Sequence, residues 1–445
     1  MSRAKDLLYG FNERPPLRES FFLTLQFIIA PGISLIFPIL VLQQLVIPVS
    51  PYFAASFISM VMIASAITTF LQAGHFFGPI GSRMFLPISA TPIYLAPAIM
   101  AVKLGGLPMV FGMSIISGVI QAIMALFVGK IKKLFPPEIA ALILILIAID
   151  LFNLGLRQYT NLGETFTIFA THYPFLSTGI KFLPLILILC FNEFGNKVLK
   201  LYGIFIAVVI SYLIIYLFNL MPHAALYAIN NAHWLFLPSL APGGYHFSIS
   251  LLIPFMIGAF VCVIKMIGSV SALQSLQNNN WQEPDMQQIS RASFTDALGS
   301  IFSGLLGGMG LNASSSNIAM SIEYKMTSRY VAYLLALILF IIAFCPKCSL
   351  ILVYLPKPII ASIFIILGVS LLSGGLKIIS NNLVTLQQRL VIGVSFVIGL
   401  SNNVYPNIYH NLPSAIQLFT GSSIAVAAIC AVIMNLLFMM ISHKK

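Results

Sequence analysis

Long, nearly uninterrupted runs of apolar residues, such as 204–217, are the feature that most constrains how this chain can fold. These runs recur along the sequence, and only 8% of the 445 residues are charged, against roughly 25% in a soluble domain. A soluble protein of this length would need a polar shell that such a composition cannot supply. The sequence therefore excludes a soluble enzyme, a disordered chain and a nucleic-acid binder, and it predicts an integral membrane protein.

The apolar runs are continuous, whereas the strands of membrane barrels alternate apolar and polar residues. They therefore predict spanning helices, each of which needs about 20 mostly apolar residues. Fourteen segments are expected, seven in each half, at 22–45, 53–73, 90–101, 107–129, 138–156, 180–194, 201–221, 248–273, 293–309, 316–326, 329–345, 358–375, 387–403 and 421–442. The predicted fold class is an all-α polytopic membrane protein.

The basic residues predict the orientation of these segments. If residues 1–21 form a cytoplasmic N-terminal segment, the inside loops collect most of the 23 Lys and Arg. The outside loops then hold only Lys103, Arg157, Lys181, Lys347 and Lys357. Cytoplasmic loops of membrane proteins carry such a positive excess. We therefore expect a multi-pass protein of the inner (plasma) membrane with both termini in the cytoplasm.

Seven segments in each half would insert the two halves in opposite orientations. Such inverted repeats are typical of secondary transporters, whose substrate sites lie where matching segments are short or interrupted. Here the third segment of each half is short, within 87–97 and 307–320. Both stretches begin with residues suited to extended backbone, so we predict strands followed by half-helices in segments 3 and 10. The N-terminal amides of half-helices favour acceptor or anionic groups on a ligand.

Several short motifs match one transporter family. They are Pro15-Pro16 before the first span, the stretches 105–113 and 135–138, the loop 229–240, Asp296-Ala-Leu-Gly299 and Ser328-Arg329-Tyr-Val331. On these motifs the chain resembles the nucleobase–ascorbate transporters, that is, the bacterial xanthine/uracil permease family. The resemblance implies a permease, often a proton symporter, for purine or pyrimidine bases such as xanthine, urate or uracil.

The resemblance also implies a core domain that moves past a gate domain in an elevator-like alternating-access mechanism. The core would comprise residues 22–130, with segments 1–4, and residues 247–350, with segments 8–11. The gate would comprise residues 131–246, with segments 5–7, and residues 351–445, with segments 12–14. Family members often form homodimers through their gate domains, so a homodimer is expected here too.

Lys265 is the sharpest candidate for a substrate contact. After the other basic residues are assigned to loops, it remains in the middle of the eighth predicted span. A charge at mid-bilayer costs at least roughly 2.5–3.5 kcal/mol unless it faces a cavity or a partner. By resemblance Lys265 replaces a glutamate that binds the base in the family. An ammonium at this position favours an anionic substrate or a coupling proton. The structural alternative is a pair with Glu323 or with a backbone carbonyl.

Ser316 and Asn317 begin the tenth segment, and by resemblance Asn317 retains one position of the family signature. Their amide and hydroxyl groups could read the edge of a planar heterocycle, although both residue types also cap helices. Thr91 and Tyr94 lie at the matching place in segment 3. The Tyr94 ring could stack on a base, or it could simply pack in the interior.

Weaker candidates complete the predicted site. Ser34 and Ser269 could contact the substrate, or they could form interhelical hydrogen bonds. Asp296 is by resemblance a core-domain acid that supports coupling, and its alternative role is that of an acid favoured by a helix N-terminus. Gln26 corresponds to the Gln of a family Gln-His pair, whose His is replaced by Phe27. Together with Glu323, Asp296 and Gln26 form the predicted supporting group.

No cofactor or metal is predicted. Cys345 and Cys348 have half of a metal-site spacing without a second pair, and no phosphate loop is present. The leading interpretation is a nucleobase permease in the lipid bilayer that binds a small-molecule substrate and a co-transported proton. Two alternatives stay open at this point. One is a transporter or channel for another small anion, related to sulfate-type carriers, and the other is a membrane enzyme acting on lipid.

Overall fold

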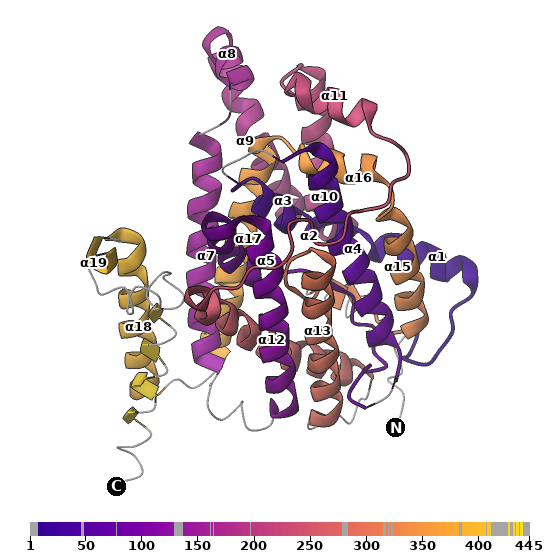
Figure 1. The fold of residues 1–445 in the computed structure, drawn as a ribbon, viewed down its shortest axis with the longest axis vertical. Coiled ribbons are helices and arrows are strands. Elements are labelled where there is room, and N and C mark those ends of the chain that lie inside the picture. Colours follow the sequence, from indigo (N-terminus) through magenta and orange to yellow (C-terminus); the bar gives the residue numbers. More distant parts are fainter. Residues whose placement is uncertain are drawn as a thin grey trace.

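The computed structural model describes residues 8–410 except for 46–48, 77, 129–136, 161, 163, 196, 278–283, 315–316, 319, 322–323, 382–384 and 406. Beyond residue 410 it describes 426–427, 430–431, 433–435 and 437–438. Most of the predicted final span, 421–442, therefore lies outside the described residues. The described chain is a bundle of helices with one small two-stranded sheet (Figure 1).

The first half of the chain contains α1 (Leu17–Phe27), α2 (Ile29–Ser34), α3 (Ile36–Leu42), α4 (Pro51–Ala73), β1 (Ile88–Ala90), the 3-10 turn η1 (Pro92–Tyr94), α5 (Leu95–Leu126), α7 (Pro137–Thr160), α8 (Glu164–His172), α9 (Pro174–Phe194), α10 (Lys197–Leu217) and α11 (His223–Asn231). The second half contains η2 (Ile249–Leu251), α12 (Leu252–Gln277), α13 (Met286–Leu306), β2 (Leu311–Ala313), α15 (Arg329–Ile342), α16 (Pro346–Val353), α17 (Lys357–Asn381), α18 (Leu386–Val404) and α19 (Asn407–His410). Helices α8, α11 and α16 are not among the sequence-predicted spans, and α8 and α11 project from one end of the bundle (Figure 1).

Five helices among the described residues are long and apolar enough to cross a membrane: Pro51–Ala73, Pro92–Leu126, Pro174–Phe194, Ile249–Gln274 and Lys357–Leu376. Large apolar side chains are exposed on several of them, for example Ile186 and Leu189 on α9. Exposed apolar surface of this kind needs a lipid environment. The chain is therefore an integral membrane protein.

The predicted first span is broken into α1, α2 and α3 rather than forming one helix. Pro31 and Pro38 lie in the first turns of α2 and α3, where the missing proline N–H is tolerated. The expected boundary between segments 3 and 4 coincides with a break in α5. There Gly105 and Gly106 leave the helical conformation, and Gly106 has a φ of 70°, which glycine adopts without steric cost.

The two short segments predicted to begin with extended backbone do so. Strand β1 pairs with β2 in antiparallel fashion, with Ile88 opposite Ala313 and Ala90 opposite Leu311. All the residues of both strands are buried. The pairing joins two segments that are more than two hundred residues apart in sequence and hold matching positions in the two predicted halves. It brings the starts of segments 3 and 10 together inside the protein.

The helices pack in two groups. Helix α5 packs on α12 and α13, and α4 packs on α13 and α15. Separately, α7 packs on α17, and α9 packs on α10 and α17. Glycines permit close approach in both groups, because a Cβ at Gly118 would lie 2.8 Å from the Ala297 carbonyl oxygen and a Cβ at Gly155 would lie 3.0 Å from that of Ala361. Small residues at helix contacts are typical of membrane helix packing.

Candidate substrate site

Lys265, in α12, reaches the end of strand β2. Its Nζ donates a hydrogen bond of 2.8 Å to the backbone carbonyl of Ala313, and the side chain is half-buried. The lysine therefore faces the start of segment 10 instead of lipid. An ammonium group carries three donors, and within the described chain only this one is used by a hydrogen bond. The other two donors are available to a ligand.

Asn317, four residues beyond Ala313, is fully buried. Its backbone N–H donates to the Ser314 hydroxyl at 3.4 Å. Its side-chain Nδ2 and Oδ1 atoms have no hydrogen-bond partner within the part of the chain that the structure describes. A buried polar group without a partner costs roughly 1–3 kcal/mol, so this amide is a strong candidate for a group that a ligand satisfies.

Asp296, in α13, also contacts strand β2. Its Oδ2 accepts hydrogen bonds of 2.6 Å from Gln121 Nε2 and from Asn312 Nδ2. One turn further along α13, the Ser300 hydroxyl bonds both the backbone N–H and the carbonyl of Leu311 at 3.1 Å. These contacts fix β2 in place. The Asp296 and Lys265 charges also lie close enough to interact electrostatically.

Tyr94 extends this polar network to the third segment. Its hydroxyl donates to Gln121 Oε1 at 3.3 Å and lies 2.8 Å from the Ser117 hydroxyl. The ring is fully buried and stacks on Phe255 with centroids 6.2 Å apart. A Cβ at Gly258 would lie 2.8 Å from the ring. In this conformation the Tyr94 ring is covered by protein on its sides instead of presenting a free face.

The other predicted site residues are more dispersed. Thr91 caps η1 by accepting the Ile93 N–H at 3.4 Å, and Ser34 donates to the Pro31 carbonyl at 2.7 Å. Ser269 lies one turn beyond Lys265 on α12 and is half-buried. Gln26 belongs to α1, and its side chain lies outside the described part of the chain. Ser316 and Glu323 also lie outside the described residues.

Two residues that the sequence analysis missed are central to the network, namely Gln121 and Asn312. Gln121 is an amide within the apolar span 107–129, and an amide inside a membrane span normally has a hydrogen-bond partner. Asn312 lies within the small-residue stretch 307–320, directly before the lysine-bound Ala313. Both residues are fully buried. In the sequence, each of them is marked by a polar side chain within a stretch of apolar or small residues.

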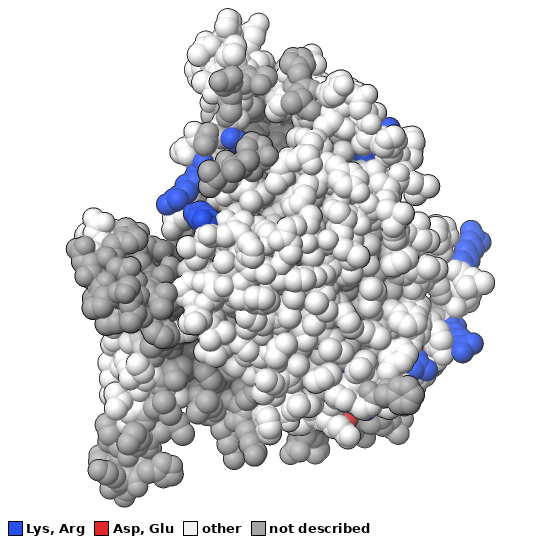
Figure 2. Space-filling model, viewed as in Figure 1, with Lys and Arg blue, Asp and Glu red and all other residues white. Residues whose placement is uncertain are grey.

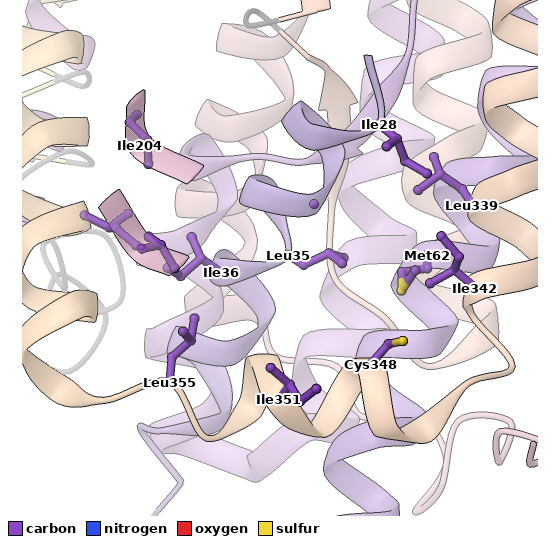
Figure 3. Close-up of a pocket in the computed structure, with 13 residues that line it drawn as sticks. Ile28, Leu35, Ile36, Met62, Ile204, Leu339, Ile342, Cys348, Ile351 and Leu355 are labelled. Atoms are coloured by element: carbon purple, nitrogen blue, oxygen red, sulfur yellow. The ribbon is translucent and has the colours of Figure 1, made fainter. Parts of the chain in front are cut away.

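A second feature is an apolar cavity of about 380 Å³, away from these polar groups (Figure 3). Its lining is Ile28, Gly32, Leu35, Ile36, Met62, Ile204, Val208, Leu339, Ile342, Cys348, Ile351, Leu355 and Ile363. Such side chains offer no strong hydrogen-bonding group for orienting a heterocycle. The cavity therefore lacks the means to recognise a polar base, and it separates helices of the two packing groups.

Interrupted helices, paired strands at their tips and a buried polar network define a polytopic membrane transporter. Residues 18–408 match the family model for xanthine and uracil permeases, described as "Permease family". The chain belongs to this permease family. The resemblance deduced from the sequence motifs is thereby confirmed, and the protein is a permease and not an enzyme.

Named relatives cover most of the chain. The xanthine permease XanP of Escherichia coli (strain K12) is 23% identical over 450 residues, which covers 97% of this chain and 95% of XanP. The uric acid permease PucK of Bacillus subtilis (strain 168) is 25% identical over 384 residues, 86% of each chain. Among solved structures, the murine Slc26a9 anion transporter in the inward-facing state superposes with a TM-score of 0.62 at 11% identity, covering 99% of this chain and 70% of that chain. At this identity the likeness shows a shared fold.

Proposed function

We propose that this permease is a secondary active transporter of a planar nucleobase of the xanthine, urate or uracil class. The family and the names of the relatives XanP and PucK support this class of substrate. The observation that carries the proposal is the combination of two unused hydrogen-bonding groups at the start of segment 10. These are the two remaining donors of Lys265 and the side-chain amide of Asn317, which has no partner among the residues that the structure describes.

The chemistry of these two groups suits a heterocycle with carbonyl oxygens. The Lys265 ammonium would donate to a carbonyl or anionic oxygen on one edge of the base, and charged hydrogen bonds of this kind are the stronger ones. The Asn317 amide offers both a donor and an acceptor, which matches the alternating edge of a purine or pyrimidine. Ser316, Ser269, Thr91, Tyr94 and Ser34 are proposed as further substrate contacts around this pair.

Transport would follow an alternating-access mechanism in which a core slides past a gate. The packing supports this division, since α5, α12, α13, α4 and α15 form one group and α7, α9, α10 and α17 form another. The apolar cavity lies between the two, with Met62 and Leu339 from the core and Val208 and Ile363 from the gate (Figure 3). A contact without directional bonds resists sliding less than a hydrogen-bonded one. The plasma membrane, cytoplasmic termini and a homodimer joined through the gates belong to the same proposal.

Proton coupling would have to use a base other than the family glutamate. In our proposal Lys265 is neutral in the empty site and takes up a proton together with an anionic substrate. Its half-buried position supports such a role, because burial disfavours the charged form of an amine. Asp296, Gln121 and Asn312 would act as positioning residues that hold β2 beside the lysine. Gln26 and Glu323 are proposed as supporting residues in the same core.

The test is uptake of labelled xanthine, urate and uracil by cells that lack their own carriers, measured at several pH values. Wild-type uptake that is lost in Lys265→Ala and retained in Lys347→Ala supports the proposal. Lys347 is a matched control because it lies on α16, where it packs over the Trp234 ring. Uptake of sulfate by the wild type, with none of the three bases transported, would contradict it.

The second candidate function is transport of another small anion. Two observations favour it, namely the basic residue at the start of segment 10 and the fold shared with a protein named as an anion transporter. The same cells separate the two functions when sulfate and bicarbonate are offered as competitors of base uptake. Competition by either ion at low concentration would support the anion function.

A further inference from the structure

Two arginines converge on one tyrosine at the edge of the bundle, and none of the three is among the proposed substrate residues. The guanidinium carbon of Arg14 lies 4.6 Å from the Tyr330 ring centroid, and that of Arg329 lies 5.4 Å from it. We call these three residues the arginine–tyrosine cluster.

Backbone contacts hold the cluster together. The N-terminal segment 8–14 runs beside residues 325–329, which lead into α15 and include its first residue. Leu8 N–H donates to the Lys325 carbonyl, Thr327 N–H to the Tyr9 carbonyl, and Arg329 N–H to the Phe11 carbonyl, at distances between 2.9 and 3.1 Å. These bonds align the two segments over several residues. The backbone pairing of these two segments therefore places Arg14 near Arg329.

Within the described chain, no ion pair to a carboxylate balances the positive charge of the cluster. Neither Arg14 nor Arg329 forms an ion pair with a carboxylate among the residues that the structure describes, and Arg329 Nε is buried without a partner. Two acidic side chains of the same N-terminal stretch have partners of their own, because Glu13 accepts the Gly10 N–H at 3.0 Å and Glu19 accepts the Tyr9 hydroxyl. Two guanidinium groups held around one ring repel each other unless an anion neutralises them.

The residues around the arginine–tyrosine cluster indicate at which level of the membrane it lies. Helices α1 and α15 both begin here and lie side by side (Figure 1). Further along, α1 exposes Phe21 and Phe22, and α15 exposes Phe340 and Ile341. Figure 2 shows Lys and Arg gathered on the same edge of the molecule, bordering an uncharged surface. Basic groups directly above exposed apolar side chains occupy the level of lipid headgroups.

We propose that the arginine–tyrosine cluster binds the phosphodiester of an anionic phospholipid headgroup. Each guanidinium can offer paired donors to phosphate oxygens, and the Tyr330 hydroxyl can donate a further bond. The exposed apolar side chains of α1 and α15 lie where the acyl chains of that lipid would run. The bound headgroup would brace residues 325–329, the connection between segment 10 and α15.

The experiment measures binding of phosphatidylglycerol to the purified full-length chain by native mass spectrometry, with phosphatidylcholine as the neutral lipid. In the double variant Arg14→Gln with Arg329→Gln, affinity for phosphatidylglycerol is expected to fall roughly 30-fold. The matched control removes the same charge elsewhere, in Arg157→Gln with Lys181→Gln, and is expected to bind as the wild type does. Arg14→Gln alone, at an exposed side chain, keeps the test usable if the double variant does not fold, with a loss of about fivefold.

Three outcomes would overturn the proposal. Equal affinity of the wild type and the Arg14 and Arg329 variants would remove the cluster from lipid binding. Equal affinity for phosphatidylglycerol and phosphatidylcholine would show that charge is not recognised. Displacement of the lipid by inorganic phosphate at similar concentration would assign the cluster to a soluble anion instead.

Discussion

The starts of segments 3 and 10 are alike in backbone and unlike in side chains. Both contribute one strand of the same buried sheet. Strand β1 is followed by η1 and α5, and residues 317–318 and 320–321 beyond β2 are helical. On the segment 3 side, the Thr91 hydroxyl caps η1 and the Tyr94 hydroxyl has two partners within the protein. On the segment 10 side, the Asn317 amide has no partner in the described chain, and Lys265 uses one donor of three.

This difference indicates that segments 3 and 10 have different roles. The backbones of β1 and β2 pair in one sheet. In segment 3, the hydroxyl groups of Thr91 and Tyr94 already have hydrogen-bond partners within the protein. Segment 10 keeps unsatisfied groups beside a basic residue, which a folded protein tolerates where a ligand completes them. The proposed binding chemistry is therefore concentrated in one half, and the following variants are chosen to break that asymmetry.

The largest effect is expected for Lys265→Ala. The substitution removes the basic group that α12 holds against the start of segment 10. With it go one or two charged hydrogen bonds to the substrate, each worth about 1.5–3 kcal/mol. Initial uptake of labelled base should fall about 100-fold at unchanged protein level in the membrane. Lys265→Arg keeps the charge and should retain part of the uptake. Normal uptake by Lys265→Ala would place substrate binding elsewhere.

Asp296→Asn should have the next largest effect. The neutral amide accepts more weakly from Gln121 and Asn312 and no longer balances Lys265, so we expect uptake to fall about tenfold. The control is Asp285→Asn on the same helix, where the carboxylate caps α13 by accepting from Gln287 N–H at 2.9 Å. That control should lower thermal stability slightly and leave uptake intact. Equal uptake in the two variants would remove Asp296 from the site.

Asn317→Ala and Thr91→Ala compare the two halves directly. Asn317 makes no side-chain hydrogen bond in the described chain, so its loss should raise KM by about tenfold without lowering the melting temperature. Thr91→Ala removes a helix cap worth about 1 kcal/mol and should lower the melting temperature. It should raise KM less than Asn317→Ala does, because the Thr91 hydroxyl is already engaged with the Ile93 N–H. Uptake kinetics and thermal unfolding in detergent give both quantities. A reversed pattern would mean that segment 3 is the binding half.

The smallest effect on uptake is expected for Gly258→Ala. A methyl group there meets the Tyr94 ring at 2.8 Å, and such overpacking costs about 1–3 kcal/mol. Gly268→Ala, on the same helix, meets no atom within 4 Å and should be neutral or slightly stabilising. Thermal unfolding of both variants measures the difference. Equal stability would show that the Tyr94 ring moves easily and is free to contact a substrate.

Much of the architecture is readable from the sequence. Continuous apolar runs predict spanning helices, and the residues around 87–97 and 307–320 predict extended backbone because prolines and small residues interrupt helices. The family is readable from short motifs spread along the chain. The broken first span was not predicted, since the hydropathy of residues 22–45 does not reveal that Pro31 and Pro38 divide it.

The site is only partly readable. Lys265 stands out because a charge in an apolar span needs a partner, and the hydrogen bond to Ala313 is the backbone-carbonyl contact that was weighed as an alternative. While this bond is kept, the two remaining donors of Lys265 are the groups available to the substrate. The link from Tyr94 through Gln121 to Asp296 could not be read, because it joins three distant helical segments through packing that no local pattern encodes.

The central claim is that Lys265 and the start of segment 10 hold a nucleobase. Equilibrium binding of labelled xanthine, urate and uracil to the purified protein tests it most directly, because binding is independent of coupling and of membrane orientation. The account predicts saturable binding of at least one base by the wild type and by Lys347→Ala, and an affinity lowered by about 100-fold in Lys265→Ala. Unchanged affinity of Lys265→Ala for the base that the wild type binds would contradict it.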